Sequence, residues 1–125
     1  LTIVGSSIMA VRAAAVADKL AEEGIDAEVI DLRSLRPIDF DTIAASVRKT
    51  HRLMVVYEGV KTMGIGAEIS AMIAESDAFD FLDAPIVRLG GAEVPLPYNP
   101  VLEKAAVPQE DDILAAARRL ARGDA

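Results

Sequence analysis

The chain has 125 residues, of which 52% are hydrophobic, and carries a formal net charge of −7 with no cysteine. That length suits one compact domain, and the missing cysteines exclude disulfides and thiolate sites. The negative charge argues against a nucleic-acid partner, which requires clustered lysine and arginine, and no apolar run approaches the roughly 18 residues of a membrane span.

The first half of the chain alternates predicted strands with predicted helices. Residues 1–4 form an apolar strand without an initiator methionine before it, so we expect residues 1–125 to be one domain of a longer subunit. A helix follows Ser7 and ends at Gly24, a residue suited to a left-handed C-cap. A second strand covers 27–32, and Asp39 caps a helix over 40–48.

The stretch 52–74 reads as strand, glycine turn and helix. Its strand, 53–56, is continuously apolar, as expected for a strand buried on both faces. Glu58 and Gly59 end this run, and apolar residues at helical spacing resume at Ile65. Because ligands of open α/β sheets bind beyond the carboxyl ends of the strands, this turn is the first place to look for a site.

The second half predicts one more strand and one more helix. Residues 79–84 read as a loop anchored by aromatic side chains, and 85–89 as the fourth strand. The stretch 92–108 holds four prolines without clear periodicity, so we expect a long loop that packs against a neighbour. The last helix covers 110–122, with acidic residues at its start and arginines at its end.

This alternation predicts an α/β fold. We expect a three-layer α/β/α domain with an open, mainly parallel sheet of four to five strands. Right-handed crossovers restrict the topology, and we favour the spatial order second, first, third, fourth strand.

The sequence offers little chemistry of its own. With one histidine, no cysteine and scattered carboxylates, it predicts no metal site. That histidine, His51, precedes the third strand and is expected in an exposed loop. Gly64 and Gly66 begin a helix, yet Ile69 stands where a dinucleotide fingerprint requires a third glycine. These glycines therefore serve either a tight turn with close helix packing or an anion site at the helix N-terminus.

Glu58 is a candidate general base, because it follows a buried strand at its carboxyl end. Glu68 is the only nearby second acid, and no serine has a local Asp–His partner or a G-x-S-x-G elbow. We therefore predict no catalytic, cofactor-binding or metal-binding residue. The residues favour a scaffold or interaction domain over an enzyme that is active alone.

Several ordered blocks resemble the transketolase-type C-terminal domain, and more closely that of the beta subunit of the first component of the pyruvate dehydrogenase complex. The resemblance covers nearly the whole chain. The matching blocks are EVIDLRSLRPID at 28–39, SVRKT at 46–50, LMVVYEG at 53–59, GIGAEI at 64–69, FLDAPI at 81–86, VPLPY at 94–98, LE at 102–103 and PQEDDI at 108–113.

The resemblance implies a subunit of a heterotetramer that oxidatively decarboxylates pyruvate, after glycolysis, and transfers the acetyl group to lipoyl groups. Thiamine diphosphate and Mg²⁺ would lie outside this domain. The implied partners are the alpha subunit, a second beta subunit and the subunit-binding domain of the dihydrolipoamide acyltransferase. The implied location is the bacterial cytoplasm or the mitochondrial matrix.

Some positions depart from the family pattern. Tyr57 stands where an acid is common, and Val60 and Lys61 replace a "WP" pair. A branched-chain 2-oxo acid or acetoin dehydrogenase therefore remains an alternative, as does a free-standing anion-binding regulatory module. The candidate interface residues are Glu58, Gly64, Gly66, Tyr98 and Asn99, with packing inside the domain as the alternative for Tyr98 and Asn99.

Overall fold

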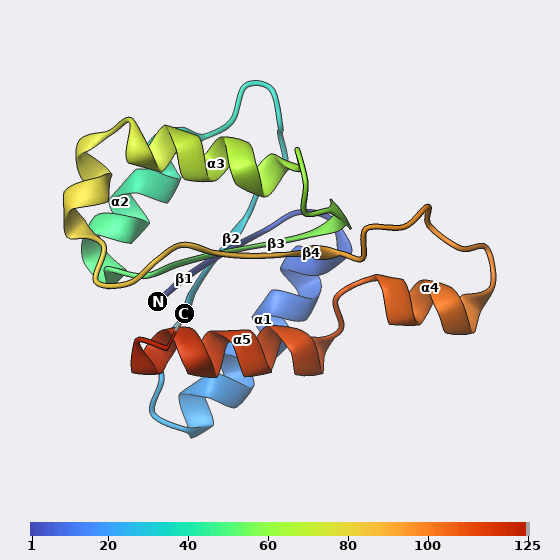
Figure 1. The fold of residues 1–125 in the computed structure, drawn as a ribbon. Coiled ribbons are helices and arrows are strands. Elements are labelled where there is room, and N and C mark those ends of the chain that lie inside the picture. The colour runs from blue at the N-terminus through green and yellow to red at the C-terminus, as the bar shows by residue number, and fades with distance from the viewer. Residues whose placement is uncertain (125) are drawn as a thin grey trace.

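The computed structural model describes residues 1–124. Along residues 1–124, strands and helices follow one another in the order that the sequence predicts, with a 3-10 helix before the fourth strand and a short helix after it in addition (Figure 1). The elements are β1 (Thr2–Gly5), α1 (Ile8–Glu22), β2 (Glu28–Asp31), α2 (Phe40–Thr50), β3 (Leu53–Val60), α3 (Ile65–Ala74), η1 (Asp77–Phe81), β4 (Val87–Gly91), α4 (Pro100–Ala106) and α5 (Glu110–Arg122).

The four strands form one parallel sheet in the order β2-β1-β3-β4, which confirms the predicted order. In the register, Ile3 of β1 lies between Val29 of β2 and Met54 of β3. The central strand β1 is fully buried, whereas the edge strand β2 is only half-buried. All strand carboxyl ends therefore meet at one edge of the sheet, which we call the carboxyl edge.

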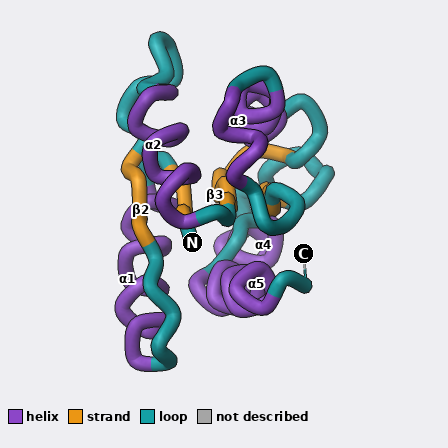
Figure 2. The backbone as a smooth tube through the Cα atoms, turned by 90° about the vertical axis from the view of Figure 1, so that its left-hand side faces the viewer, coloured by secondary structure: helices purple, strands orange, loops and turns teal. Residues whose placement is uncertain are grey.

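Helices cover both faces of the sheet. Helices α1 and α5 lie on one face and α2 and α3 on the other, as the two views agree (Figures 1 and 2). Alternation along β3 divides the core accordingly: Met54 and Val56 belong to the cluster under α1 and α5, and Val55 and Tyr57 to the cluster under α2 and α3.

Two loop predictions are wrong in detail. The stretch predicted as a loop over 92–108 contains α4, and the aromatic residues of 79–84 belong partly to η1. Phe79 and Phe81 are exposed and are therefore no core anchors, although Phe81 stacks on His51. His51 ends α2 in the left-handed conformation, and its Nδ1 lies 2.8 Å from the Phe81 carbonyl oxygen.

A chain of hydroxyl groups links the sheet to α2. Thr2 is fully buried, and its Oγ1 lies 2.6 Å from the hydroxyls of Ser46 and Thr50. Ser46 in turn donates to Glu28 Oε2 at 2.7 Å, and Lys49 lies beside the same carboxylate. The Ser46 hydrogen bond, followed by Lys49, lowers the pKa of Glu28.

We expect Ser46→Ala to raise the pKa of Glu28 toward its ordinary value, because the hydroxyl donor to the carboxylate is lost. A folded-state pKa below the unfolded one stabilises the protein above the unfolded pKa, and that stabilisation is lost as the pH falls through the folded pKa. The variant should thus lose less stability on acidification. Carboxyl-carbon NMR titration checks the shift, and Thr50→Val, which spares the Ser46–Glu28 bond, should leave it unchanged.

Candidate functional site

The glycine turn after β3 is built around the ring of Tyr57. Tyr57 is 3% exposed, and its hydroxyl donates to the Lys61 carbonyl oxygen at 3.4 Å. A Cβ placed on Gly64 would lie 2.5 Å from Tyr57 Cε2, and one on Gly66 would lie within 3.0 Å of Cζ. Close packing of turn and helix against the ring therefore explains these glycines.

The same turn is a poor cradle for an anion. Tyr57 occupies the space between Gly64 and Gly66, and the amide of Thr62 already donates to Glu93 Oε1 at 2.8 Å. Gly66 is buried, so it offers no surface to a ligand or a partner. Of the five residues predicted at an interface, Gly64 and Gly66 therefore serve packing inside the domain.

A projecting segment follows β4 at the carboxyl edge. This segment, residues 92–107, is called the arm; in Figure 1 its helix α4 stands apart from the layers on the same side as the strand ends. None of the α4 residues is buried. A short helix with no buried face gains little from intradomain packing, so other contacts must hold it.

Three local features stabilise the arm. Asn99 caps α4 by accepting hydrogen bonds from the amides of Val101 and Leu102, at 2.9 and 3.3 Å. Pro100 occupies the first helical turn, where its missing N–H costs nothing. The amide of Ala92 donates to the carbonyl of Ala106 at 2.8 Å, which closes the base of the arm.

The arm exposes apolar side chains to an unusual extent. Tyr98 is fully exposed and Val101 is 77% exposed, which excludes the intradomain packing considered for Tyr98. Two more exposed apolar residues lie at the same edge of the sheet: Val60, the last residue of β3, and Met63 in the turn after it. The apolar surface, as we call it, consists of Val60, Met63, Val94, Leu96, Tyr98, Val101 and Leu102.

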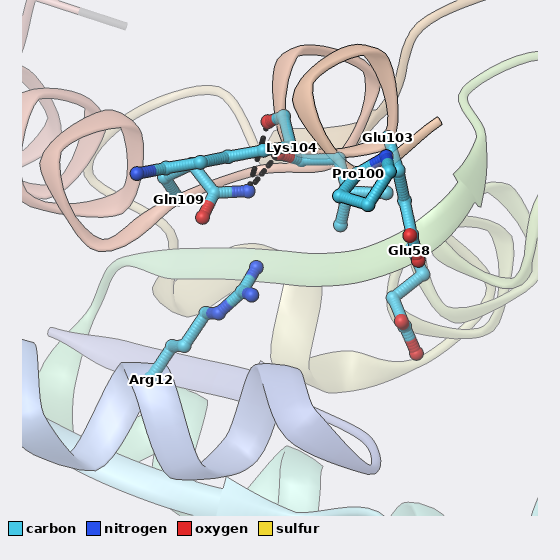
Figure 3. A pocket seen from close by; sticks show the side chains of 7 residues that line it. Arg12, Glu58, Pro100, Glu103, Lys104 and Gln109 are labelled. Atoms are coloured by element: carbon cyan, nitrogen blue, oxygen red, sulfur yellow. Dashed lines mark hydrogen bonds between the residues drawn. The ribbon is translucent and has the colours of Figure 1, made fainter. Parts of the chain in front are cut away.

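A polar cavity of about 310 Å³ lies under the arm, between α4, α1 and the end of β3 (Figure 3). Arg12 projects into it from α1 and donates to the Pro108 carbonyl oxygen at 2.5 Å. Gln109 anchors its far side by donating to the carbonyls of Lys104 and Val107, at 3.0 and 2.6 Å. Glu58 and Glu103 also line it, and both are exposed.

An apolar cavity of about 220 Å³ adjoins the polar one and shares Glu58 with it. Its other walls come from the end of β3 and from both ends of the arm, including Val60, Leu96 and Ala106. The carboxyl edge therefore presents a carboxylate, a hollow and exposed apolar side chains together. Exposed apolar side chains gathered beside a hollow are typical of a surface that binds a ligand or another protein.

Sequence reasoning names three residues at this edge as interface candidates, and their role there stays a prediction. Glu58, Tyr98 and Asn99 all lie at the carboxyl edge, although Asn99 acts as a helix cap. It missed Arg12 and Glu103, which lie far apart in the sequence and meet only in the fold. The Asn99-Pro100 pair, an N-cap followed by a proline, was the one local signal for α4.

The family resemblance places thiamine diphosphate and Mg²⁺ outside this domain, which stays a prediction. Within residues 1–124, no group of three His, Asp or Glu side chains could hold a metal ion. None of the helices described is long and apolar enough to cross a membrane.

Comparison with known families agrees with the fold. The sequence profile of the family "Transketolase, C-terminal domain" matches residues 1–113. A solved structure named "Split gene transketolase, inactive beta4 tetramer" superposes with a TM-score of 0.84 at 28% identity, covering 99% of this chain and 40% of that one.

The chain has a higher sequence identity to several curated relatives than to this solved structure. The chain is 53% identical over 119 residues to "Pyruvate dehydrogenase E1 component subunit beta-2, mitochondrial" of Oryza sativa subsp. japonica, covering 95% of this chain and 31% of the relative. It is 54% identical to the beta-1 subunit of Arabidopsis thaliana, covering 95% and 32%, and 48% identical to the beta subunit of Bos taurus, covering 95% and 33%. The chain thus spans about a third of the length of these relatives.

Proposed function

The chain belongs to the transketolase C-terminal domain family, and from this premise we propose that it is the C-terminal domain of a pyruvate dehydrogenase E1 beta subunit. The similarity of about half of all residues to beta subunits supports this choice over other transketolase-type enzymes. In this proposal residues 1–125 are one domain of a longer subunit. The whole enzyme decarboxylates pyruvate oxidatively and transfers the acetyl group to a lipoyl group.

The domain's own role in this proposal is association. The observation that carries it is the apolar surface, because α4 has no buried residue and Tyr98 is fully exposed. Exposed apolar patches on a folded domain mark surfaces that another protein covers. The partners are the alpha subunit and a second beta subunit, and the acyltransferase's subunit-binding domain docks on the assembled enzyme.

In this proposal, the cofactors and the catalytic residues lie in other parts of the enzyme. In our proposal, thiamine diphosphate and Mg²⁺, which this enzyme class requires, bind outside this chain. Among residues 1–124, no group of three or more His, Cys, Asp or Glu side chains could hold a metal ion. Its location is the mitochondrial matrix, as the names of the relatives support, or the cytoplasm of a bacterium. The chain alone is then expected neither to bind thiamine diphosphate nor to decarboxylate pyruvate.

We expect the double substitution Val101→Ser/Leu102→Ser to prevent assembly of the full-length beta subunit with its alpha subunit. Both side chains are more than half exposed. The change therefore removes apolar contact area from the apolar surface, with little effect on the stability of the domain itself. Sedimentation of co-expressed subunits measures assembly, circular dichroism verifies folding, and turnover of pyruvate and of branched-chain 2-oxo acids tests the substrate.

Phe79→Ser is the matched control, because Phe79 is similarly exposed but lies in η1, away from the apolar surface. It should assemble and turn over pyruvate like the unmodified subunit. Normal assembly of the double variant would refute the association role, and turnover of branched-chain substrates alone would refute the assignment to pyruvate.

A further inference from the structure

The outer side of β4 is an open edge of the sheet. Because the strand order is β2-β1-β3-β4, β4 pairs with β3 on one side only. Its residues are half-buried except Gly91, which is buried. Within residues 1–124, the backbone of 86–90 forms no backbone hydrogen bond outside the sheet. The outward N–H and C=O groups of this edge are therefore available to another strand.

A cavity of about 320 Å³ follows this edge. It is lined by four consecutive residues, 86–89, and by Ala116 and Arg119 of α5. In Figure 1, α5 passes below β4 while α3 lies above it. Helix α5 therefore forms the floor of a groove that runs along the strand. A groove of this shape, beside unpaired backbone groups, suits a polypeptide in an extended conformation.

The charged side chains of the groove are mostly basic. Lys61, Arg88 and Arg119 line it, and Asp124 is the one carboxylate among its lining residues within 1–124. The three bases come from the turn after β3, from β4 and from α5, and thus meet only in the fold. The chain as a whole carries a net charge of −7. The groove therefore concentrates positive charge on an acidic domain.

The bases lie on both faces of the open edge. Val87 and Leu89 pack against the core under α1 and α5, so Arg88 between them points to the opposite face. There its Nη1 donates to the Lys61 carbonyl oxygen at 3.2 Å, which orients the guanidinium. Arg119 lies on the α5 side. Since successive side chains of an added strand point to opposite faces, two adjacent acids in it would meet Arg88 and Arg119.

We propose that the open edge of β4 binds an extended acidic segment of a partner protein as an additional strand of the sheet. The segment's backbone pairs with the outward groups of 86–89, and two adjacent carboxylates pair with Arg88 and Arg119. Backbone pairing supplies affinity in such binding, and the side chains supply specificity. This surface is separate from the apolar surface at the carboxyl edge, so the inference goes beyond the proposed association role.

Charge complementarity favours an acidic segment over a second copy of this chain. Two copies that paired through β4 would bring two sets of the same three bases together, and like charges at a strand edge oppose pairing. The same bases attract carboxylates. The open edge is therefore protected against self-association while it accepts an acidic strand.

The test uses the full-length subunit that contains this chain and the fluorescein-labelled peptide Thr-Val-Glu-Glu-Val-Thr, with binding measured by fluorescence anisotropy. We expect saturable binding, which Lys61→Gln/Arg119→Gln weakens by about 10-fold or more at low salt because two of the three cations are lost. Both residues are exposed, so the substitution spares the fold. Arg33→Gln/Arg36→Gln, the same charge change in the exposed loop after β2, should bind the peptide as the unmodified subunit does.

Two altered peptides separate charge from strand pairing. Replacing both glutamates with glutamine should weaken binding about 10-fold, and N-methylation of the two central amides should abolish it because strand pairing is lost. Equal binding of the N-methylated peptide would overturn the added strand, and equal binding of the glutamine peptide would overturn the role of the bases.

Absence of peptide binding overturns the inference as a whole. A sedimentation coefficient of the subunit that falls on dilution, and that Lys61→Gln/Arg119→Gln raises, would then identify a second copy as the occupant. The proposed association role does not depend on these outcomes, because Val101→Ser/Leu102→Ser tests it at the apolar surface.

Discussion

Gly66→Ala is expected to destabilise the domain by about 3 kcal/mol. The new Cβ would lie 3.0 Å from Tyr57 Cζ and closer still to Cε1. Tyr57 is 3% exposed and enclosed by the turn and α3, so its ring has no free direction in which to move. Gly66 lies in the first turn of α3, where the helix-propensity gain of alanine over glycine is at most about 1 kcal/mol and offsets only part of this overpacking. Urea unfolding followed by circular dichroism measures the loss.

Gly59→Ala, at the end of β3, is the matched control because Gly59 lies near the same ring. Its Cβ would meet only Tyr57 Cδ2, at 3.9 Å, which is ordinary contact, so we expect a change within about 0.5 kcal/mol. Tyr57→Leu tests the cause, because it removes the ring atoms that the alanine would strike. In that background Gly66→Ala should cost less than about 1.5 kcal/mol. An equal cost in both backgrounds would show that Tyr57 is not the source.

The layers and the strand order were predictable because they depend on periodicity. The apolar run 53–56 predicts a strand, and the helical spacing after Ile65 predicts a helix, each from local sequence alone. The rules for connecting parallel strands then permit few strand orders. The observed order β2-β1-β3-β4 is the predicted one. The glycines at 64 and 66 fitted either an anion loop or close packing, and only the position of the Tyr57 ring decided between them.

The surface at the carboxyl edge was harder to predict because its residues are distant in sequence. Arg12, Glu58 and Glu103 come from α1, β3 and α4, and no spacing rule connects them. Helix α4 was missed because it has seven residues and prolines around it, so periodicity had little length in which to appear. Exposed apolar residues such as Tyr98 also look like core residues in a sequence, since only the fold distinguishes the two.

Gly91→Ala is expected to disturb both the sheet and the arm. Gly91 ends β4 opposite Val60, and a Cβ there would collide with the Glu58 carbonyl oxygen and lie 3.2 Å from that of Ala106. Both obstacles are backbone atoms, which cannot turn aside as a side chain can. We expect a loss of about 3 kcal/mol or more in the free energy of unfolding, measured by urea titration.

Proteolysis of the arm gives a second, independent measure of the effect of Gly91→Ala. The Ala92 amide follows Gly91 directly, so separating β4 from β3 also strains its 2.8 Å hydrogen bond to Ala106. We expect limited trypsin digestion to cut after Lys104 faster in Gly91→Ala than in the unmodified chain. Asn99→Ala, which removes only the cap of α4, should increase the same cut with a loss of about 1 kcal/mol or less in global stability.

The contrast between these two variants distinguishes the sheet from the arm as the part that keeps the apolar surface in place. Strand β3 supplies Glu58 and the arm supplies Glu103 and Leu102, and Gly91 is where strand and arm meet. If Gly91→Ala left the tryptic cut unchanged while it lowered global stability, the arm would be held by its own cap and by Gln109. Faster cutting in both variants instead means that the close approach at Gly91 fixes the arm to the sheet, and with it the position of Glu103 relative to Glu58.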